Sequence, residues 1–314
     1  MTNSSQTKIA FFGECMIELS GDPIHKGFGG DTLNTALYLS RLTASYPVQV
    51  FYATGLGDDV LSRELTERWQ HEGIATDFIE IFPAKLPGLY MVQTDQAGER
   101  SFLYWRDKAA VKSYFSTSSL NKLETAILNK ALDYLYLSGI SIAILDDESK
   151  IRLSRALKQF SDAGGTVVFD NNFRPQLWSA AHAQYWYSQI LPFVDIALIT
   201  EDDDVLVWGE EESVAQRCLR FGCQEIVIKR GCEPCKLIWQ QDGEYKLAHV
   251  AAESVANVID TCAAGDSFAA GYLAGRLTGQ SCEASAQKGH ALAATVIQYP
   301  GAIIPNEAMI HLIR

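Results

Sequence analysis

The sequence predicts an α/β protein with a doubly wound, mostly parallel sheet flanked by helices. Short apolar runs rich in β-branched residues alternate with amphipathic stretches along the whole 314-residue chain. Several of these runs are apolar throughout, as expected for strands that are covered on both faces. A chain of this length can bury roughly three quarters of its unfolded surface. No repeat or low-complexity linker divides it, so we expect a single domain over residues 1–314.

The elements follow one another in a regular order. Strand-like runs and helical patterns take turns, which favours parallel pairing of the strands through helical crossovers. The candidate strands are Ile9–Phe12, Val48–Ala53, Tyr134–Leu137, Thr166–Asp170, Ile196–Thr200, Ile226–Lys229 and Leu237–Trp239. The candidate helices are 31–43, 59–73, 119–130, 147–163, 182–191, 211–221, 266–278 and 283–298.

Two segments depart from this alternation. Residues 14–30 carry scattered apolar positions followed by several glycines, and residues 86–107 have the pattern of a hairpin. The hairpin arms are 89–94 and 100–106, rich in aromatic and β-branched residues, with a turn at 95–98. We expect the two segments to form a small β-sheet that acts as a lid over the mouth of the main sheet.

Composition excludes several classes of protein. The chain has 26 basic and 38 acidic residues, a formal charge of 26 − 38 = −12, which disfavours general binding of nucleic acid. No apolar run approaches the ~18 residues of a membrane span. The start has no signal-peptide pattern, and the count of seven cysteines is odd, so we expect reduced thiols and a cytoplasmic location. Cys232 and Cys235 have C-x-x-C spacing without a second ligand pair, so we interpret them as structural or incidental cysteines and not as a zinc site. The strand-like residues on either side place them at a turn between two strands.

Several common motifs are missing or incomplete. The chain has no Gly-Lys dipeptide and therefore no P-loop. Gly55-Leu-Gly57 begins like a dinucleotide fingerprint but lacks its third glycine. The segment around Ser141 nearly matches a hydrolase nucleophile elbow, but its final glycine is Ala143. We interpret Ser141 as a turn or helix-cap residue and keep a hydrolase as a distant alternative.

The most specific motif is Asp260-Thr-Cys-Ala-Ala-Gly-Asp266, which opens a helix crowded with small residues. Small residues at 263–265 let the backbone approach a ligand, and a helix N-terminus is an anion site. An Asp beside an anion is unfavourable unless it handles a proton or a metal. Asp266 is therefore a candidate general base beside a phosphoryl-transfer cradle. The alternative is a plain Asp helix cap with small residues for packing.

Two polar clusters accompany this motif. Gly27-Phe-Gly-Gly-Asp-Thr-Leu-Asn34 runs into a helix and places Asn34 one turn inside it, where an amide suits sugar hydroxyls. Asp170-Asn-Asn-Phe-Arg174-Pro lies at the C-terminal end of a strand, the edge where open α/β sheets bind ligands. A glycine turn with a locally satisfied Asn is the alternative for the first cluster.

With these motifs the chain resembles the ribokinase-like (PfkB-type) carbohydrate kinase family over about residues 8–305. Its motifs are most similar to those of the family members that phosphorylate 2-keto-3-deoxygluconate. The segments that carry this narrower similarity are Gly13-Glu-Cys-Met-Ile-Glu-Leu19, Tyr104-Trp-Arg106, Asp170–Pro175, Val227–Gly231 and Gly301-Ala-Ile-Ile-Pro305. The resemblance implies transfer of phosphate from MgATP to the C6 hydroxyl of the sugar acid, giving 2-keto-3-deoxy-6-phosphogluconate. It is also compatible with a monovalent cation.

The resemblance also implies roles for individual residues. Asp266 would be the base, and the backbone N–H groups of residues 263–266 would form the anion hole. The sugar acid would contact Gly30, Asp31, Asn34, Tyr90, Tyr104, Arg106, Arg174 and Asp266. The nucleotide and its phosphates would contact Asn172, Arg174, Lys229, Gly231, Ala263, Ala264 and Gly265.

The chain departs from the family pattern at two places. The first anion-hole position, usually Gly, is Ala263, whose N–H can serve if its φ is negative. The family's N-x-x-E element corresponds to Thr200–Asp203, so Asp203 is the candidate for an indirect contact to Mg²⁺, which would be held mainly by phosphates and waters.

Alternatives remain open on this evidence. A neutral-sugar kinase of the fructokinase type would not require the pair Arg106 and Arg174, which suits a carboxylate. Either arginine could instead pair only with a carboxylate such as Asp107 or Asp170. A non-catalytic sugar-binding regulator on the same fold is a third possibility, which an intact Asp266 disfavours.

We further expect a homo-oligomer, with a dimer surface on the lid formed by Leu89, Met91, Phe102 and Trp105.

Overall fold

The main sheet confirms the predicted fold class. The computed structural model describes residues 6–94 and 100–313, and within them nine strands form one sheet. In spatial order they are β13 (Glu244–Val250), β12 (Cys235–Gln241), β11 (Glu225–Lys229), β10 (Ile196–Thr200), β9 (Thr166–Asp170), β8 (Tyr134–Ser138), β1 (Thr7–Phe12), β4 (Val48–Leu56) and β5 (Ile79–Ile81). Every pair from β5 to β11 is parallel, and only β12 and β13 are antiparallel.

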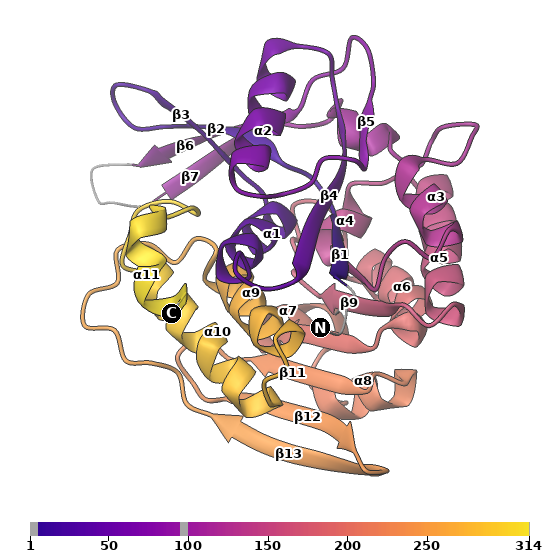
Figure 1. The fold of residues 1–314 in the computed structure, drawn as a ribbon, viewed down its shortest axis with the longest axis vertical. Coiled ribbons are helices and arrows are strands. Elements are labelled where there is room, and N and C mark those ends of the chain that lie inside the picture. The colour runs from indigo at the N-terminus through magenta and orange to yellow at the C-terminus, as the bar shows by residue number, and fades with distance from the viewer. Residues whose placement is uncertain (1–5, 95–99, 314) are drawn as a thin grey trace, which may run out of the picture.

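Helices cover both faces of this sheet (Figure 1). The first layer, with its own apolar core, contains α1 (Asp31–Leu42), α2 (Val60–His71), α9 (Ala264–Leu277), α10 (Cys282–Val296) and α11 (Ile310–Ile313). The opposite layer contains α3 (Lys122–Leu128), α4 (Gly139–Ala143), α5 (Asp147–Asp162), α6 (Ala180–Ile190), α7 (Glu201–Trp208) and α8 (Val214–Phe221). Short 3₁₀ turns occupy 110–113, 191–193 and 306–309.

Local sequence explains where many of these helices begin. Asp59 caps α2 by accepting hydrogen bonds from the N–H groups of Leu61 and Ser62. Asp146 caps α5 in the same way. The close packing of α9 on α10 depends on glycine, because a Cβ at Gly271 would come within 2.7 Å of the Cα of Gly289. This contact sets the position of α9, whose N-terminus carries the DTCAAGD motif.

A second, smaller sheet forms from the two segments that depart from the alternation. Its order is β3 (His25–Gly29), β2 (Met16–Ser20), β6 (Gly88–Thr94) and β7 (Arg100–Trp105). It projects from the main body beside α2 (Figure 1). The predicted turn at 95–98 lies outside the described residues. In the register of β6 and β7, Tyr90 pairs with Tyr104 and Leu89 with Trp105, so the two pairs face opposite sides of the small sheet.

The structure adds elements that the sequence patterns did not predict. β5 has only three residues, and β13 alternates exposed polar and apolar side chains at the edge of the sheet. Neither pattern is distinctive within its own few residues. The helix α7 begins at Glu201, inside the segment expected to serve as the metal-binding element. Cys232 lies in the predicted turn between β11 and β12, and Cys235 is the first residue of β12.

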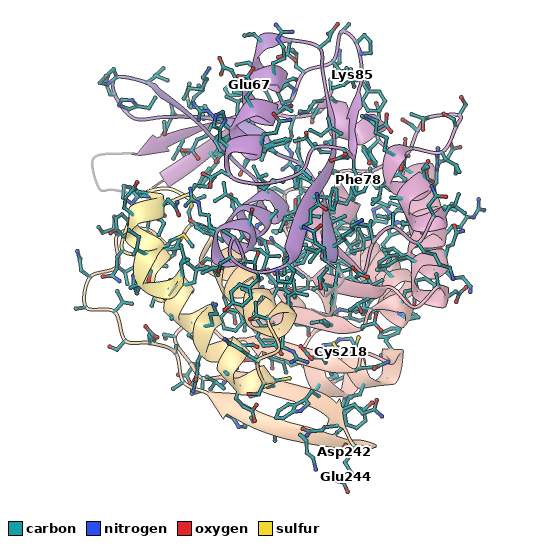
Figure 2. The ribbon with its side chains drawn as sticks, viewed as in Figure 1. Glu67, Phe78, Lys85, Cys218, Asp242 and Glu244 are labelled. Atoms are coloured by element: carbon teal, nitrogen blue, oxygen red, sulfur yellow. The ribbon has the colours of Figure 1, made fainter. Side chains whose placement is uncertain are left out.

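The antiparallel end of the main sheet lies far from the small sheet. Asp242 and Glu244 mark the turn between β12 and β13, whereas Glu67 of α2 lies at the other end of the molecule (Figure 2). Among the described residues, no helix combines the length and apolar character needed to cross a bilayer.

Candidate active site

A cavity of about 990 Å³ lies between the carboxyl ends of the main-sheet strands and the small sheet. Its size suits a small-molecule site at the upper end of the usual range. All but one of the predicted ligand contacts line it: Gly30, Asp31, Asn34, Tyr90, Tyr104, Arg106, Asn172, Arg174, Lys229, Ala263, Ala264, Gly265 and Asp266. Asp203 lines it as well. The exception, Gly231, lies in the turn after β11 with φ +58° and is not part of the lining.

Asp266 lies in the first turn of α9 and faces α1. The side-chain amide of Asn34 donates a hydrogen bond to its Oδ2 at 2.8 Å, across 232 residues of sequence. The other amide atom, Oδ1 of Asn34, is buried and has no hydrogen-bond partner among the described residues. It therefore retains capacity for a ligand hydroxyl in the cavity, as the predicted sugar contact requires.

Burial raises the pKa of Asp266 to about 7. This value already includes the neighbouring carboxylates Asp31 and Asp170, which also raise the pKa, and the Asn34 hydrogen bond and Lys229 ammonium, which lower it. A base with a pKa near the operating pH combines ionisation with proton affinity. The environment of Asp266 is thus suited to proton transfer, which a surface helix-cap Asp would not need.

This pKa predicts an acidic limb in the pH profile. The base must be ionised, so kcat/KM for the acceptor should fall below pH 7 and approach a tenfold loss per pH unit. The value of kcat/KM for the acceptor would be measured from pH 5.5 to 8.5, with the acceptor varied at saturating MgATP. A profile that stays flat down to pH 5.5 would contradict the assignment. The residual activity of Asp266→Asn should show no acidic limb. A limb caused by protonation of the ATP phosphates would instead persist in that variant.

The turn before α9 corrects one expectation. Ala263 has φ +57° and ψ +16°, a left-handed conformation, so the negative φ on which its role in the anion hole depended is not met. The chain must reverse sharply here, because the side chain of Asp260 accepts hydrogen bonds from the N–H groups of Cys262 and Gly301 and ties two loops together. An L-residue in this conformation is strained by roughly 1–2 kcal/mol. Such strain is typical of functional sites.

The predicted anion hole is partly available. The N–H of Ala264 donates to the carbonyl of Thr261 at 3.2 Å, so the turn itself already engages one predicted donor. The N–H groups of Gly265 and Asp266 have no acceptor among the described residues. A Cβ at Gly265 would meet only Lys229 Nζ, at 3.7 Å, within 4 Å. Glycine at 265 therefore leaves open space beside a cation and two free donors, as a phosphate requires.

Lys229 is held at this cradle by Asp170. Its ammonium lies 2.6 Å from Asp170 Oδ2 at the C-terminal ends of β11 and β9. The other oxygen, Asp170 Oδ1, is buried without a partner among the described residues. Asp170 was not among the predicted site residues, although it opens the motif Asp170–Pro175. Its position could have been inferred from the parallel order of the two strands.

Two asparagines organise the end of β9. Asn171 forms a paired contact with the backbone of Thr200, accepting from its N–H at 2.8 Å and donating to its carbonyl at 3.0 Å. Asn172, with φ +25°, donates to Asp31 Oδ2 at 2.9 Å. Burial raises the pKa of Asp31. These contacts bring β9, β10 and the start of α1 together around the cavity.

Arg174 and Asp203 form the rim of the cavity on this side. Arg174 Nη1 lies 3.4 Å from Asp203 Oδ2, and the arginine side chain is 47% exposed. Burial raises the pKa of Asp203, and Arg174 opposes that shift. Within the described residues, no cluster of three or more His, Cys, Asp or Glu could cage a metal. A metal bound mainly by phosphates and water needs no such cluster, and Asp203 stays the candidate for an indirect contact to Mg²⁺.

The small sheet contributes Tyr90, Tyr104 and Arg106 to the opposite wall. The hydroxyl of Tyr90 donates to Glu18, and Arg106 pairs with Glu14. The arginines thus pair with Glu14 and Asp203, not with Asp107 or Asp170, the partners that the sequence suggested. Both still line the cavity.

Two further sequence interpretations concern side-chain orientation. The side chain of Ser141 is buried, and its hydroxyl donates to the carbonyl of Phe12 at 2.6 Å. Ser141 belongs to the capping box of α4, which confirms the cap interpretation.

Phe102 lines the cavity and stacks on Tyr104, whereas Trp105 is 57% exposed on the other face of the small sheet. The expected dimer surface therefore cannot use Phe102 and Trp105 from one face.

Sequence comparison identifies the family pattern in this chain. The pattern of the pfkB family of carbohydrate kinases matches residues 6–309. A relative from Dickeya dadantii (strain 3937), a 2-dehydro-3-deoxygluconokinase, is 46% identical over 306 residues, covering 96% of this chain and 98% of the relative.

Solved structures share the fold. A PfkB protein from Polaromonas sp. JS666 has a TM-score of 0.80 at 23% identity, covering 93% of this chain and 96% of that one. A putative ribokinase II from Escherichia coli, determined with ATP and Mg²⁺, has a TM-score of 0.78 at 20% identity and covers 94% of each chain.

Proposed function

Because the chain belongs to the pfkB family of carbohydrate kinases, we propose that it transfers the terminal phosphoryl group of ATP to the C6 hydroxyl of 2-keto-3-deoxygluconate. The 46% identity over nearly the full length to a 2-dehydro-3-deoxygluconokinase, an enzyme for the same sugar acid under its other name, supports this substrate. The observation that carries the chemistry is Asp266, half-buried beside a phosphate cradle with a pKa of about 7.

Asp266 acts as the general base in this reaction. Its carboxylate accepts the proton of the acceptor hydroxyl as that oxygen attacks the phosphoryl group. Asn34 donates to Oδ2 of Asp266 and so holds the carboxylate in one orientation. The free Oδ1 of Asn34 accepts from a sugar hydroxyl and places the acceptor beside the base.

The cradle opposite the base stabilises the charge of the transferred group. The N–H groups of Gly265 and Asp266 have no acceptor among the described residues, and the ammonium of Lys229 lies 3.7 Å from where a Cβ at Gly265 would be. Such preorganised donors act most strongly where charge develops in the transition state. Mg²⁺, when bound with ATP, neutralises phosphate charge, and Asp203 would contact it through water.

The two arginines favour a sugar acid over a neutral sugar. Arg106 and Arg174 approach the cavity from the small sheet and from the end of β9. A neutral hexose would leave both guanidinium groups without an anionic ligand, which a carboxylate supplies with parallel hydrogen bonds. A fructokinase from Vibrio alginolyticus is only 25% identical to this chain.

The experiment that tests this function is a coupled assay of ATP consumption with a panel of sugars and sugar acids. We expect rapid turnover with 2-keto-3-deoxygluconate and little with fructose or ribose. Equal efficiency with fructose would favour a neutral-sugar kinase. Binding of sugar acid without ATP consumption would favour a non-catalytic regulator.

We further propose that the segments 14–30 and 86–107 form a lid that closes over the sugar. Sugar acid should then slow hydrogen exchange in 86–107 more than in the helix at 147–163, because the cavity wall becomes ordered on binding. Exchange mass spectrometry with and without substrate measures this difference. Equal protection of both segments would remove the lid role.

The remaining expectations belong to the same proposal. An ATP-consuming metabolic enzyme with reduced thiols fits the cytoplasm. A homodimer through the small sheet would use its outer face, where Leu103 and Trp105 are 43% and 57% exposed. A monovalent cation requirement remains a prediction, to be tested by replacing potassium with a bulky organic cation in the assay.

A further inference from the structure

Glu14 is a buried acidic residue at the junction of the two sheets. It follows β1 and precedes β2, and its side chain is 2% exposed. It lines the cavity, and although it lies in the segment 13–19 that carries the family resemblance, no role was assigned to it from the sequence. Its Oε2 accepts a hydrogen bond from Nη2 of Arg106, whose side chain is 11% exposed.

Close backbone packing leaves Glu14 little freedom. A Cβ at Gly88, the first residue of β6, would lie 2.5 Å from Glu14 Oε1 and 3.3 Å from Arg106 Cβ. A Cβ at Gly30 would lie 2.1 Å from the Glu14 carbonyl oxygen. Glycine at both positions allows the start of α1 and the start of β6 to close on Glu14, which confines its carboxylate.

The guanidinium of Arg106 is held on two sides. Glu14 occupies Nη2, and the ring of Tyr104 lies 5.8 Å from the guanidinium carbon. The Nε of Arg106 is buried and has no partner among the described residues, and Oε1 of Glu14 is in the same situation. The arginine thus keeps donors for a ligand while its orientation is set by protein contacts.

Stability alone gives a weak reason for such a pair. Two charges lose their hydration on burial, and their attraction often does no more than offset that loss. Burial raises the pKa of Glu14, while Arg106 and Lys112 oppose the shift. A buried pair with unfilled hydrogen-bond capacity on both partners, at the wall of a ligand cavity, is better explained by orientation of a binding group.

We propose that Glu14 is a positioning residue that orients the guanidinium of Arg106 toward the carboxylate of the sugar acid. This inference rests on the proposed function, because it presupposes an anionic acceptor. Glu14 does not touch the substrate in this role. It acts through Arg106, and it also links the small sheet to the end of β1.

A double-mutant cycle tests the proposal through KM for the sugar acid. Glu14→Gln keeps the shape of the side chain but removes the charge, so we expect KM to rise about tenfold, the size of one charge-assisted hydrogen bond. The KM for ATP should change less than about twofold, since Glu14 acts only on the sugar side. In an Arg106→Lys background, Glu14→Gln should raise the sugar-acid KM by less than about a further twofold, because the effects of residues that act through one contact are not additive.

A second variant covers the case in which the neutral side chain prevents folding. Glu14→Asp keeps the charge but withdraws the carboxylate by one methylene, so a folded variant should also raise the sugar-acid KM. Glu64→Gln is the matched control, because Glu64 forms an exposed pair with Lys26 of the same small sheet, away from the cavity. We expect its kinetics to equal those of the wild type.

The outcomes separate this inference from the proposed function. If the wild type does not phosphorylate the sugar acid, the proposed function fails. If it does, three results would overturn the role of Glu14. The first is an unchanged sugar-acid KM in folded Glu14→Gln or Glu14→Asp, and the second is an equal rise in the KM for ATP. The third is a double variant whose rise in sugar-acid KM equals the product of the two single rises.

Discussion

Replacement of Asp266 by Asn is expected to lower kcat about 10²–10⁴-fold, the contribution of a positioned general base. The amide cannot accept the proton of the attacking hydroxyl, so the oxygen must attack while still protonated. The hydrogen bond from Asn34 can persist, because the new side-chain carbonyl still accepts it. Steady-state kinetics with saturating MgATP and sugar acid give the number, and equilibrium titration should show ATP binding unchanged.

The same variant provides its own test of folding. A carboxyl whose pKa is raised by the fold contributes stability below its unfolded pKa and loses that contribution as the pH rises through about 7. At pH 8 the wild type must keep a half-buried, ionised Asp266, whereas the variant carries a neutral amide. Thermal melting at pH 8 should therefore show the variant at least as stable as the wild type.

A matched substitution controls for the loss of a negative charge at a helix start. Asp147 lies in the first turn of α5, and its side chain is 66% exposed. Asp147→Asn should leave kcat within about twofold, since surface substitutions of this kind have small effects. Near-normal turnover in folded Asp266→Asn would remove Asp266 as the base and leave it as an acidic residue in the first turn of α9, which is capped by Ala263 without a side-chain hydrogen bond.

Replacement of Arg106 by Lys is expected to raise KM for the sugar acid by about 10–100-fold and to leave KM for ATP nearly unchanged. Lysine retains the charge but loses the planar fork that binds a carboxylate through two parallel hydrogen bonds. A hydrogen bond to a charged group contributes about 1.5–3 kcal/mol, which corresponds to this range.

The comparison with a neutral sugar makes this prediction specific. Any weak activity on fructose should be affected much less by Arg106→Lys, because fructose has no carboxylate. Arg220→Lys is the control, since Arg220 forms an exposed pair with Glu212 on the α8 side of the molecule. If the sugar-acid KM does not change in Arg106→Lys, the arginine does not recognise the carboxylate, and a neutral-sugar kinase becomes the better interpretation.

Much of the fold could be predicted because its signals are local. A strand such as Ile196–Thr200 is apolar at successive positions, and a helix such as α5 begins at Asp146, a favoured cap. Each of these signals depends on only a few neighbouring residues. The strands at the margins were missed for the same reason: β5 has three residues, and β13 is partly exposed at the edge.

The sequence by itself determined the order of strands and helices, the small-residue turn before Asp266, and the presence of polar groups at the strand ends. Those features depend on residue type and spacing within short segments. They were sufficient for the family and the fold class, and they made Asp266 the candidate for the base.

Only the tertiary structure decided how these groups are paired and charged. Asn34 meets Asp266 across 232 residues, and Glu14 meets Arg106 across 92. These contacts depend on the packing of α1 on α9 and on the junction between the two sheets, which no local pattern records. The left-handed φ of Ala263 and the raised pKa of Asp266 have the same origin, because a backbone turn is imposed by the loops it joins and a pKa depends on burial among distant residues.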